Sequence, residues 1–174
     1  LSGDLSHGHP VPPNVRYTGP LSRFSDIVIP GPAEKKYSLM VILSGPEPQR
    51  TIFEEKVMGQ LGGVEGKVLV VRGKPGEPAP GEHLPDNVQV VPHLATPDML
   101  ATILSAELVV SRSGYSSVMD FHLLGKMSAF VPTPGQTEQE YLAERMKRNG
   151  LCCYERQGEF SLRRMMKEAK THYT

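Results

Sequence analysis

Residues 106–141 carry the side chains whose types and spacing suit ligand chemistry. An apolar strand is predicted at 108–110, and a small polar turn follows it at 111–114. A helical stretch containing the acid Asp120 comes next, then a second apolar strand at 129–131 and a loop rich in Pro, Gly, Gln and Glu. Backbone N–H groups at a helix start can hold phosphate, so this order of elements predicts a nucleotide site in an open α/β sheet.

The polar turn reads Ser-Arg-Ser-Gly, and its residues allow two interpretations. Gly114 permits the close approach of a phosphate or sugar. Arg112 either reaches the ligand or braces the fold, and Ser113 either lies at the ligand or caps the following helix. The turn is not a Walker A loop, since no Gly-Lys-Ser/Thr follows, and it is not a GxGxxG dinucleotide fingerprint.

Asp120 and the loop after the second apolar strand supply further candidates. Asp120 lies six residues past Gly114, where a carboxylate would accept two hydrogen bonds from a ribose diol. The alternative is an ordinary helix acid that faces solvent. Gln136, Gln139 and Glu140 offer donors and acceptors that suit sugar hydroxyls, or they belong to a helix start with favourable early acids.

Another candidate loop spans 44–50 and follows a continuous apolar run at 39–43. Ser44 and Gly45 are small enough to let a ligand approach the backbone, and Arg50 would pair with a phosphate. A β–α turn stiffened by proline explains the same composition without any ligand.

Apolar runs alternate with helical patterns along most of the chain. We predict strands at 39–43, 67–72, 88–91, 108–110, 129–131 and 151–154. We predict helices at 51–61, 98–104, 115–124, 138–148 and 161–172. The alternation favours an α/β fold, a Rossmann-like parallel sheet with helices on both faces. In such sheets ligands bind beyond the carboxyl ends of the strands, which is also where His93 follows the third strand.

Composition excludes several classes of function. The 174 residues include 19 basic and 19 acidic side chains, so no broad attraction to nucleic acid is expected. Adjacent Cys152 and Cys153 are read as reduced thiols of a cytoplasmic protein. His7 and His9 are too few for a metal site, and no apolar run spans a bilayer. No Ser/His/Asp trio can be defended from spacing, and no catalytic base stands out.

Residues 1–26 are punctuated by Pro and Gly and lack an initiator Met. We interpret them as an interdomain linker and expect that the chain is a fragment whose preceding domain is missing. Residues 27–174 would then form one ligand-binding domain, a size that can bury a sizeable core.

The chain resembles the C-terminal, donor-nucleotide domain of the family 28 glycosyltransferases. Within the family it most resembles the N-acetylglucosaminyltransferases that form lipid II for peptidoglycan. The resemblance is strongest over 106–142, in AELVVSRSG, Asp120, Gly125, FVP, and Gln139 with Tyr141. It extends more weakly through VVPHL, LSGPEPQR and YTGPLSR.

This resemblance implies the C-terminal half of a GT-B enzyme, in which two Rossmann-like domains face a cleft. This half would bind a UDP-sugar and would need no metal or other cofactor. The missing half would bind a lipid-linked or glycan acceptor and would supply the catalytic base, so no catalytic residue is expected in this chain. The full-length enzyme would invert the sugar and would contact the inner face of the plasma membrane peripherally.

The family's donor contacts fall on identifiable positions of this sequence. Asp120 stands where the family has a Glu that binds ribose, and Gln139 stands at a Gln that contacts the donor sugar. Glu140 replaces a second Gln of the lipid II enzymes, which leaves the identity of the sugar open. Ser113 and Gly114 match the glycine turn near the phosphates.

The remaining matches lie outside residues 106–142. Ser44 and Gly45 fall in the first phosphate loop, where SGPEPQ replaces the family's GGS-x-G. Arg23 matches a linker Arg near the nucleotide, and the backbone at His93 and Leu94 would face the uracil. Two alternatives to a transferase stay open: one half of a nucleotide-sugar epimerase, and a non-catalytic module that binds a nucleotide sugar.

Overall fold

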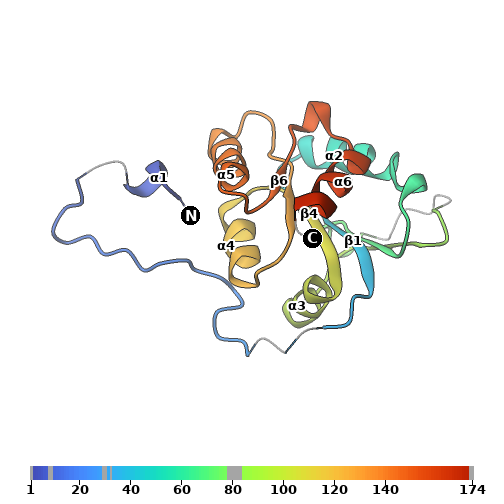
Figure 1. Ribbon diagram of the computed structural model, residues 1–174, viewed down its shortest axis with the longest axis horizontal. Coiled ribbons are helices and arrows are strands. Elements are labelled where there is room, and N and C mark those ends of the chain that lie inside the picture. The colour runs from blue at the N-terminus through green and yellow to red at the C-terminus, as the bar shows by residue number, and fades with distance from the viewer. Residues whose placement is uncertain (1, 8–9, 29–30, 32, 78–83, 173–174) are drawn as a thin grey trace.

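The fold is a single parallel sheet covered by helices, as a computed structural model describes it for residues 2–7, 10–28, 31, 33–77 and 84–172 (Figure 1). Its strands lie in the order β3-β2-β1-β4-β5-β6, and every neighbouring pair is parallel. The strands are Tyr37–Ile42 (β1), Val68–Val71 (β2), Val88–Val91 (β3), Ala106–Ser111 (β4), Ser128–Phe130 (β5) and Cys153–Tyr154 (β6). The predicted strands and the predicted α/β fold are confirmed.

Helices connect the strands on both faces of the sheet. The α-helices are Asp4–His7 (α1), Gln49–Met58 (α2), Thr96–Ser105 (α3), Tyr115–Leu123 (α4), Thr137–Arg148 (α5) and Leu162–His172 (α6). Two short 3₁₀ turns follow α2 and β6, at Leu61–Gly63 (η1) and Gln157–Glu159 (η2). The five predicted helices are confirmed, whereas α1 and both 3₁₀ turns are additions that the apolar pattern did not indicate.

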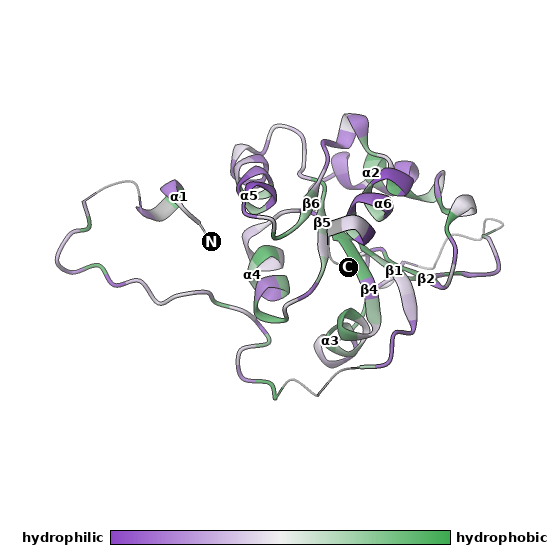
Figure 2. Cartoon of the chain, viewed as in Figure 1, coloured by the Kyte–Doolittle hydropathy of each residue, from purple (hydrophilic) through white to green (hydrophobic). Residues whose placement is uncertain are grey.

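The strands are apolar on both faces because each face has its own core. Alternate residues of a strand point to opposite sides, so Leu39 and Val41 enter one core while Met40 enters the other. Helices α2 and α6 cover the first core, and α3, α4 and α5 cover the second. Figure 2 shows the result, with hydrophobic strands at the centre and hydrophilic outer surfaces on α5 and α6.

The strand order reverses direction between β1 and β4. The chain first builds the sheet outward from β1 through β2 to β3, and then returns to place β4 on the other side of β1. The loops that leave β1 and β4 at the carboxyl edge therefore diverge to opposite faces of the sheet. Ligands of doubly wound sheets bind at this switch point.

The segment before β1 contacts the sheet domain through α4. The backbone N–H of Leu21 lies 2.9 Å from Met119 Sδ, and Phe24 is fully buried in the core under α3, α4 and α5. Phe24 lies inside the segment predicted as a linker, so part of that segment belongs to the hydrophobic core. Leu21 itself is 68% exposed.

Candidate functional site

Three strand ends bring the predicted loops together at the carboxyl edge of the sheet. β1, β4 and β5 are direct neighbours, with Ile42 opposite Ser111 and Ser111 opposite Phe130. The loops that follow them begin at these paired residues. The candidate residues after β1, β4 and β5 therefore converge although they are far apart in the sequence.

The first loop turns sharply at Gly45. This glycine has φ +105°, a conformation that residues with a Cβ rarely adopt, and both it and Ser44 are exposed. Glu47 ties the loop to the start of α2 by accepting hydrogen bonds from Arg50 Nε at 2.7 Å and from the Thr51 N–H at 3.1 Å. These bonds, with the Thr51 hydroxyl, hold the pKa of Glu47 at about 2. The loop is thus fixed by the chain's own side chains.

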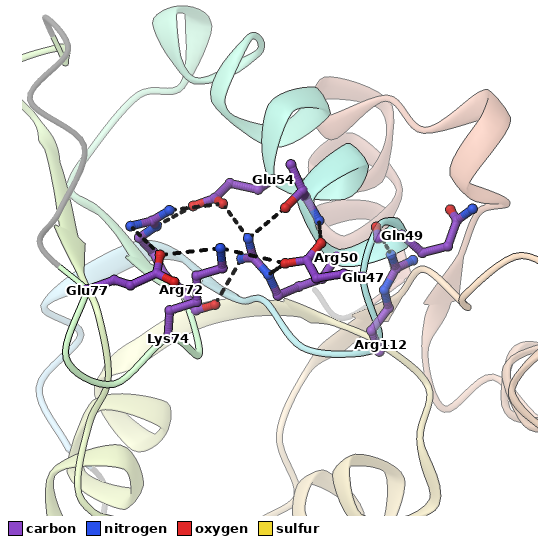
Figure 3. Close-up of polar contacts among 9 residues, drawn as sticks. Glu47, Gln49, Arg50, Glu54, Arg72, Lys74, Glu77 and Arg112 are labelled. Atoms are coloured by element: carbon purple, nitrogen blue, oxygen red, sulfur yellow. Dashed lines mark hydrogen bonds and ion pairs between the residues drawn. The ribbon is translucent and has the colours of Figure 1, made fainter.

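Arg50 does not serve as the predicted phosphate ligand. Its side chain is 5% exposed, and its guanidinium donates to Glu47, to Glu54 Oε2 at 2.9 Å and to the Arg72 carbonyl at 3.2 Å (Figure 3). Arg72 closes the network from β2 by donating to both oxygens of Glu54. Arg50 therefore holds the loop in place and has no group directed toward a ligand.

Glu54 is the centre of this network. Burial alone would raise the pKa of its carboxyl, but the hydrogen bonds from Arg72 and Arg50 outweigh burial and keep the pKa below its ordinary value. Lys74 and Glu77 extend the network at the surface, with Lys74 Nζ 3.6 Å from Glu47 and 3.3 Å from Glu77. The charges brace β1, α2 and the end of β2 against one another.

Arg112 clamps the loops from beneath. It is 2% exposed, and its guanidinium lies 4.4 Å from the centre of the Phe53 ring. Its two terminal nitrogens donate to four uncharged oxygens: Val131 O, Pro132 O, Gln49 O and Gln157 Oε1. Burial lowers the pKa of Arg112 to about 10, so the side chain stays cationic at neutral pH. The positive charge is therefore held at the sheet edge with neutral partners.

Ser113 does not cap α4 as one interpretation expected. Its hydroxyl is buried and donates to the Gln139 carbonyl at 2.8 Å, which joins the β4 turn to α5. Gly114 occupies the cap position of α4. Because glycine has no side chain, nothing at this position shields the first N–H groups of the helix. Those N–H groups have no partner within the helix and face the carboxyl edge.

Gln136 and Gln139 line a hollow of about 400 Å³ beside that helix start. Gly114, Gly135, Thr137 and Glu138 complete its lining. Gln139 Oε1 accepts from the Thr133 N–H at 2.9 Å, and its Nε2 donates to Gln136 Oε1. Glu140 is half-buried in the same turn of α5 but does not line the hollow. The two glutamines are thus pre-positioned by each other.

Asp120 is buried, so the alternative of a solvent-facing helix acid is wrong. It is 3% exposed and accepts hydrogen bonds from Ser22 Oγ at 2.6 Å and Arg23 Nε at 2.9 Å. The linker therefore lies on the carboxylate that was predicted to bind ribose. Arg23 is itself 48% exposed at the side chain and stacks 4.9 Å over Phe24.

His93 and Leu94 lie at the same edge of the sheet but beyond β3, two strands away from β1. His93 is exposed and Leu94 packs against the core under α3. They lie away from the Gly45 and Gly114 turns. An elongated ligand bound at those turns would extend along the edge toward them.

Residues 51–173 match the glycosyltransferase family 28 C-terminal domain. The chain belongs to this family. The match begins within α2 and extends through α6, so it includes the candidate residues from His93 onward and leaves out those of the linker and the first loop. The resemblance stated from the sequence is confirmed.

A curated relative of this family 28 domain comes from Caldicellulosiruptor saccharolyticus. Its full name is UDP-N-acetylglucosamine--N-acetylmuramyl-(pentapeptide) pyrophosphoryl-undecaprenol N-acetylglucosamine transferase. It is 32% identical over 68 residues, which are 38% of this chain and 18% of that protein. The chain therefore spans only part of the length of this relative.

Solved glycosyltransferases share the fold of the family 28 domain. Acinetobacter baumannii MurG superposes with a TM-score of 0.59 at 17% identity, over 83% of this chain and 46% of that one. The glycosyltransferase of kitacinnamycin gives a TM-score of 0.64 at 16% identity, over 86% and 38%. SnogD from Streptomyces nogalater gives 0.59 at 17% identity, over 83% and 38%. The fold is that of the C-terminal half of a GT-B glycosyltransferase, as predicted.

A larger hollow of about 850 Å³ lies away from the family 28 candidate site, between α5, β6 and α6. Three ion pairs neutralise its walls: Arg156 with Glu144, Lys147 with Glu168, and Arg164 with Glu155. Because these opposite charges are paired, they leave little net electrostatic potential to attract a charged ligand. We therefore place the candidate site at the edge of the sheet instead.

The described residues contain no group of three or more His, Cys, Asp or Glu that could hold a metal ion. His9 lies outside them. Cys152 and Cys153 are free and buried, and burial raises their pKa values to about 12 and about 11. No helix in the described part of the chain is long and apolar enough to cross a membrane.

Sequence reasoning missed several residues that shape the site. Ser22, Gln157 and the pair Glu54 and Arg72 carried no local motif, and each acts through a partner distant in the sequence. Gln157 reaches Arg112 across 45 positions, for example. Thr133 bonds Gln136 and Gln139, three and six positions away, and it carried no motif either. For Arg72, Thr133 and Gln157 the available signal was a polar residue at or just after the end of a predicted strand.

Proposed function

We propose that this domain binds a UDP-sugar and that the whole protein transfers a hexosamine to a lipid-linked or glycan acceptor. The observation that carries the proposal is the convergence, in a family 28 domain, of the Gly45 and Gly114 turns with the starts of α4 and α5 at the β1–β4 switch point. N-acetylglucosamine is the proposed sugar, because the curated relative is named for that donor.

The diphosphate lies between the two glycine turns in this proposal. Ser44 and Gly45 meet it from β1, and Gly114 with the first N–H groups of α4 meets it from β4. The positive end of the α4 dipole and the buried charge of Arg112 stabilise the anion, so no metal ion is required. In this proposal the uracil extends along the edge of the sheet toward His93 and Leu94.

The sugar occupies the hollow at the start of α5. Gln136 and Gln139 hydrogen-bond its hydroxyls, and Glu140 helps to set the sugar that is accepted. In this proposal Asp120 binds the ribose diol after Ser22 of the linker releases its carboxylate, with Arg23 beside it. An acceptor hydroxyl then attacks the anomeric carbon from the opposite side and UDP leaves, which inverts the configuration. The base that removes the acceptor's proton comes from outside this chain.

The setting proposed for the whole protein follows from the acceptor. A lipid-linked acceptor places the enzyme in the cytoplasm at the inner face of the plasma membrane, in peripheral contact with it. The acceptor and this contact belong to the part of the protein outside the present chain.

Titration of the ¹⁵N-labelled chain with UDP and UDP-N-acetylglucosamine tests the proposal. Both ligands should shift the amide signals of Gly45 and Gly114, and only the sugar nucleotide should also shift those of Gln136 and Gln139. Spectra unchanged at millimolar ligand contradict the proposal. Incubation of the whole protein with UDP-N-acetylglucosamine and a lipid-linked acceptor then separates transfer from epimer formation and from binding without turnover.

A further inference from the structure

Two buried polar atoms without a partner lie near Gly45 of the first loop. Arg112 Nε and Thr133 Oγ1 have no hydrogen-bond partner among the residues that the structure describes, and both side chains are 2% exposed. Unpaired polar atoms are rare in protein interiors because each costs about 1–3 kcal/mol. Two such atoms close to one glycine therefore indicate a ligand group that accepts a hydrogen bond from each of them.

The unpaired atoms are held rigidly in this position. The other nitrogens of Arg112 are fixed by four oxygens, and its guanidinium stacks on Phe53, so the Nε edge cannot rotate away. The Thr133 N–H donates to Gln139 Oε1, and the Thr133 carbonyl accepts from the Gln136 N–H at 3.1 Å. Thr133 is thus anchored to the two glutamines that line the proposed sugar hollow.

Gly45 lies next to these two atoms. A Cβ at this position would lie 3.4 Å from Thr133 Oγ1 and 3.9 Å from Arg112 Nε, and Gly45 itself is exposed. The missing side chain therefore leaves space for a ligand atom beside both polar groups. We call Gly45, Arg112 and Thr133 the oxygen cradle.

We propose that the oxygen cradle binds one non-bridging phosphate oxygen of the donor's diphosphate, with Thr133 as a ligand-binding residue. This inference rests on the proposed function and adds Thr133 to its site. The Arg112 N–H and the Thr133 hydroxyl both donate, so the group they share must accept two hydrogen bonds. The guanidinium has only neutral partners here, so an anionic oxygen supplies the charge it lacks.

The cradle predicts selectivity that a purely structural threonine would not give. It contacts the phosphate and does not contact the nucleoside. A change at Thr133 should therefore lower the affinity for UDP and for inorganic pyrophosphate, while the affinity for uridine stays the same. The same contact should move the ³¹P resonances of bound UDP. A threonine that only packs the core would affect all three ligands equally, through stability.

Calorimetric titration of the chain with UDP, pyrophosphate and uridine tests the cradle, with the two variants Thr133→Val and Thr133→Ser. Valine keeps the shape but removes the hydroxyl, and the loss of one hydrogen bond to a charged group should weaken UDP and pyrophosphate roughly tenfold. Serine keeps the hydroxyl and should stay within about threefold of the parent chain. Circular dichroism of both variants confirms that they are folded.

The outcomes separate the cradle from the proposed function. If UDP binds the parent chain and Thr133→Val equally well, with equal ³¹P shifts, the cradle is wrong and the UDP site stands. If Thr133→Val lowers the affinity for uridine as much as that for UDP, Thr133 has a structural role and the cradle is again wrong. If the parent chain binds neither UDP nor pyrophosphate, both proposals fail.

Discussion

The substitution Glu54→Gln tests whether buried charges fix the first glycine turn. Glu54 accepts hydrogen bonds from Arg72 Nε at 2.5 Å, from Arg50 Nη2 at 2.9 Å and from Arg72 Nη2 at 3.3 Å. Its side chain is 10% exposed, and those of Arg50 and Arg72 are 5% and 12% exposed. Glutamine retains the shape, loses the charge and turns an N–H₂ group toward two arginines.

The expected cost is about 3 kcal/mol of unfolding free energy, the lower end of what breaking a buried ion pair costs. Arg50 keeps Glu47 as a partner, which limits the loss. For a protein of this size the cost corresponds to a fall of about 9 °C in Tm. Glu55→Gln is the matched control, because Glu55 is the next residue of α2 and is exposed; it should cost less than about 0.5 kcal/mol.

Urea unfolding at several pH values measures both effects. The pKa of Glu54 is lowered on folding, so its contribution to stability is complete above its ordinary value of 4.5 and is lost as the pH falls through the lowered folded value. The stability gap between the parent chain and Glu54→Gln should therefore be constant near neutral pH and should shrink below about pH 4.5. A gap below about 1 kcal/mol, or one that acid leaves unchanged, refutes the reasoning.

Three further predictions follow from particular contacts. Phe24→Ala should cost about 3 kcal/mol in urea unfolding, because the ring is fully buried, whereas Leu21→Ala at an exposed position should cost less than about 1 kcal/mol; equal costs would contradict the placement of Phe24 in the core. Asp120→Asn should lower the affinities for uridine and UDP alike by about tenfold in calorimetric titration, because it removes a charged acceptor from the ribose. Unchanged affinities would exclude Asp120 from the site. Cys152 and Cys153 should resist a disulfide reagent at pH 8 in the native chain and react in urea, because burial raises the pKa of both thiols; rapid native labelling would be the contrary result.

Much of the fold was predictable because its determinants are local. Buried parallel strands read as continuous apolar runs, and each run from Leu39 onward marks a strand within two residues of its observed ends. The short elements were missed for the opposite reason. A helix of four residues such as α1 has no full apolar period, and a 3₁₀ turn such as η2 depends on its neighbours in space.

The site was predictable only in outline. The glycine turns and the glutamines after β5 follow from loop composition and from the rule that ligands meet strand ends. The hydrogen bonds between side chains do not follow from the sequence. Arg112 donates to partners 19, 20, 45 and 63 positions away, and Asp120 accepts hydrogen bonds from residues 97 and 98 positions earlier. The sequence therefore left two interpretations open for Arg50 and for Ser113. Thr133, whose partners lie three and six positions away, carried no motif.

A crystal structure of the chain with bound UDP tests the central claim most directly. The account predicts a diphosphate at the carboxyl edge of the sheet between β1 and β4, within hydrogen-bond distance of the Gly45 turn and of the first N–H groups of α4. UDP bound in the charged hollow between α5 and α6, with the edge between β1 and β4 free of ligand, would contradict it.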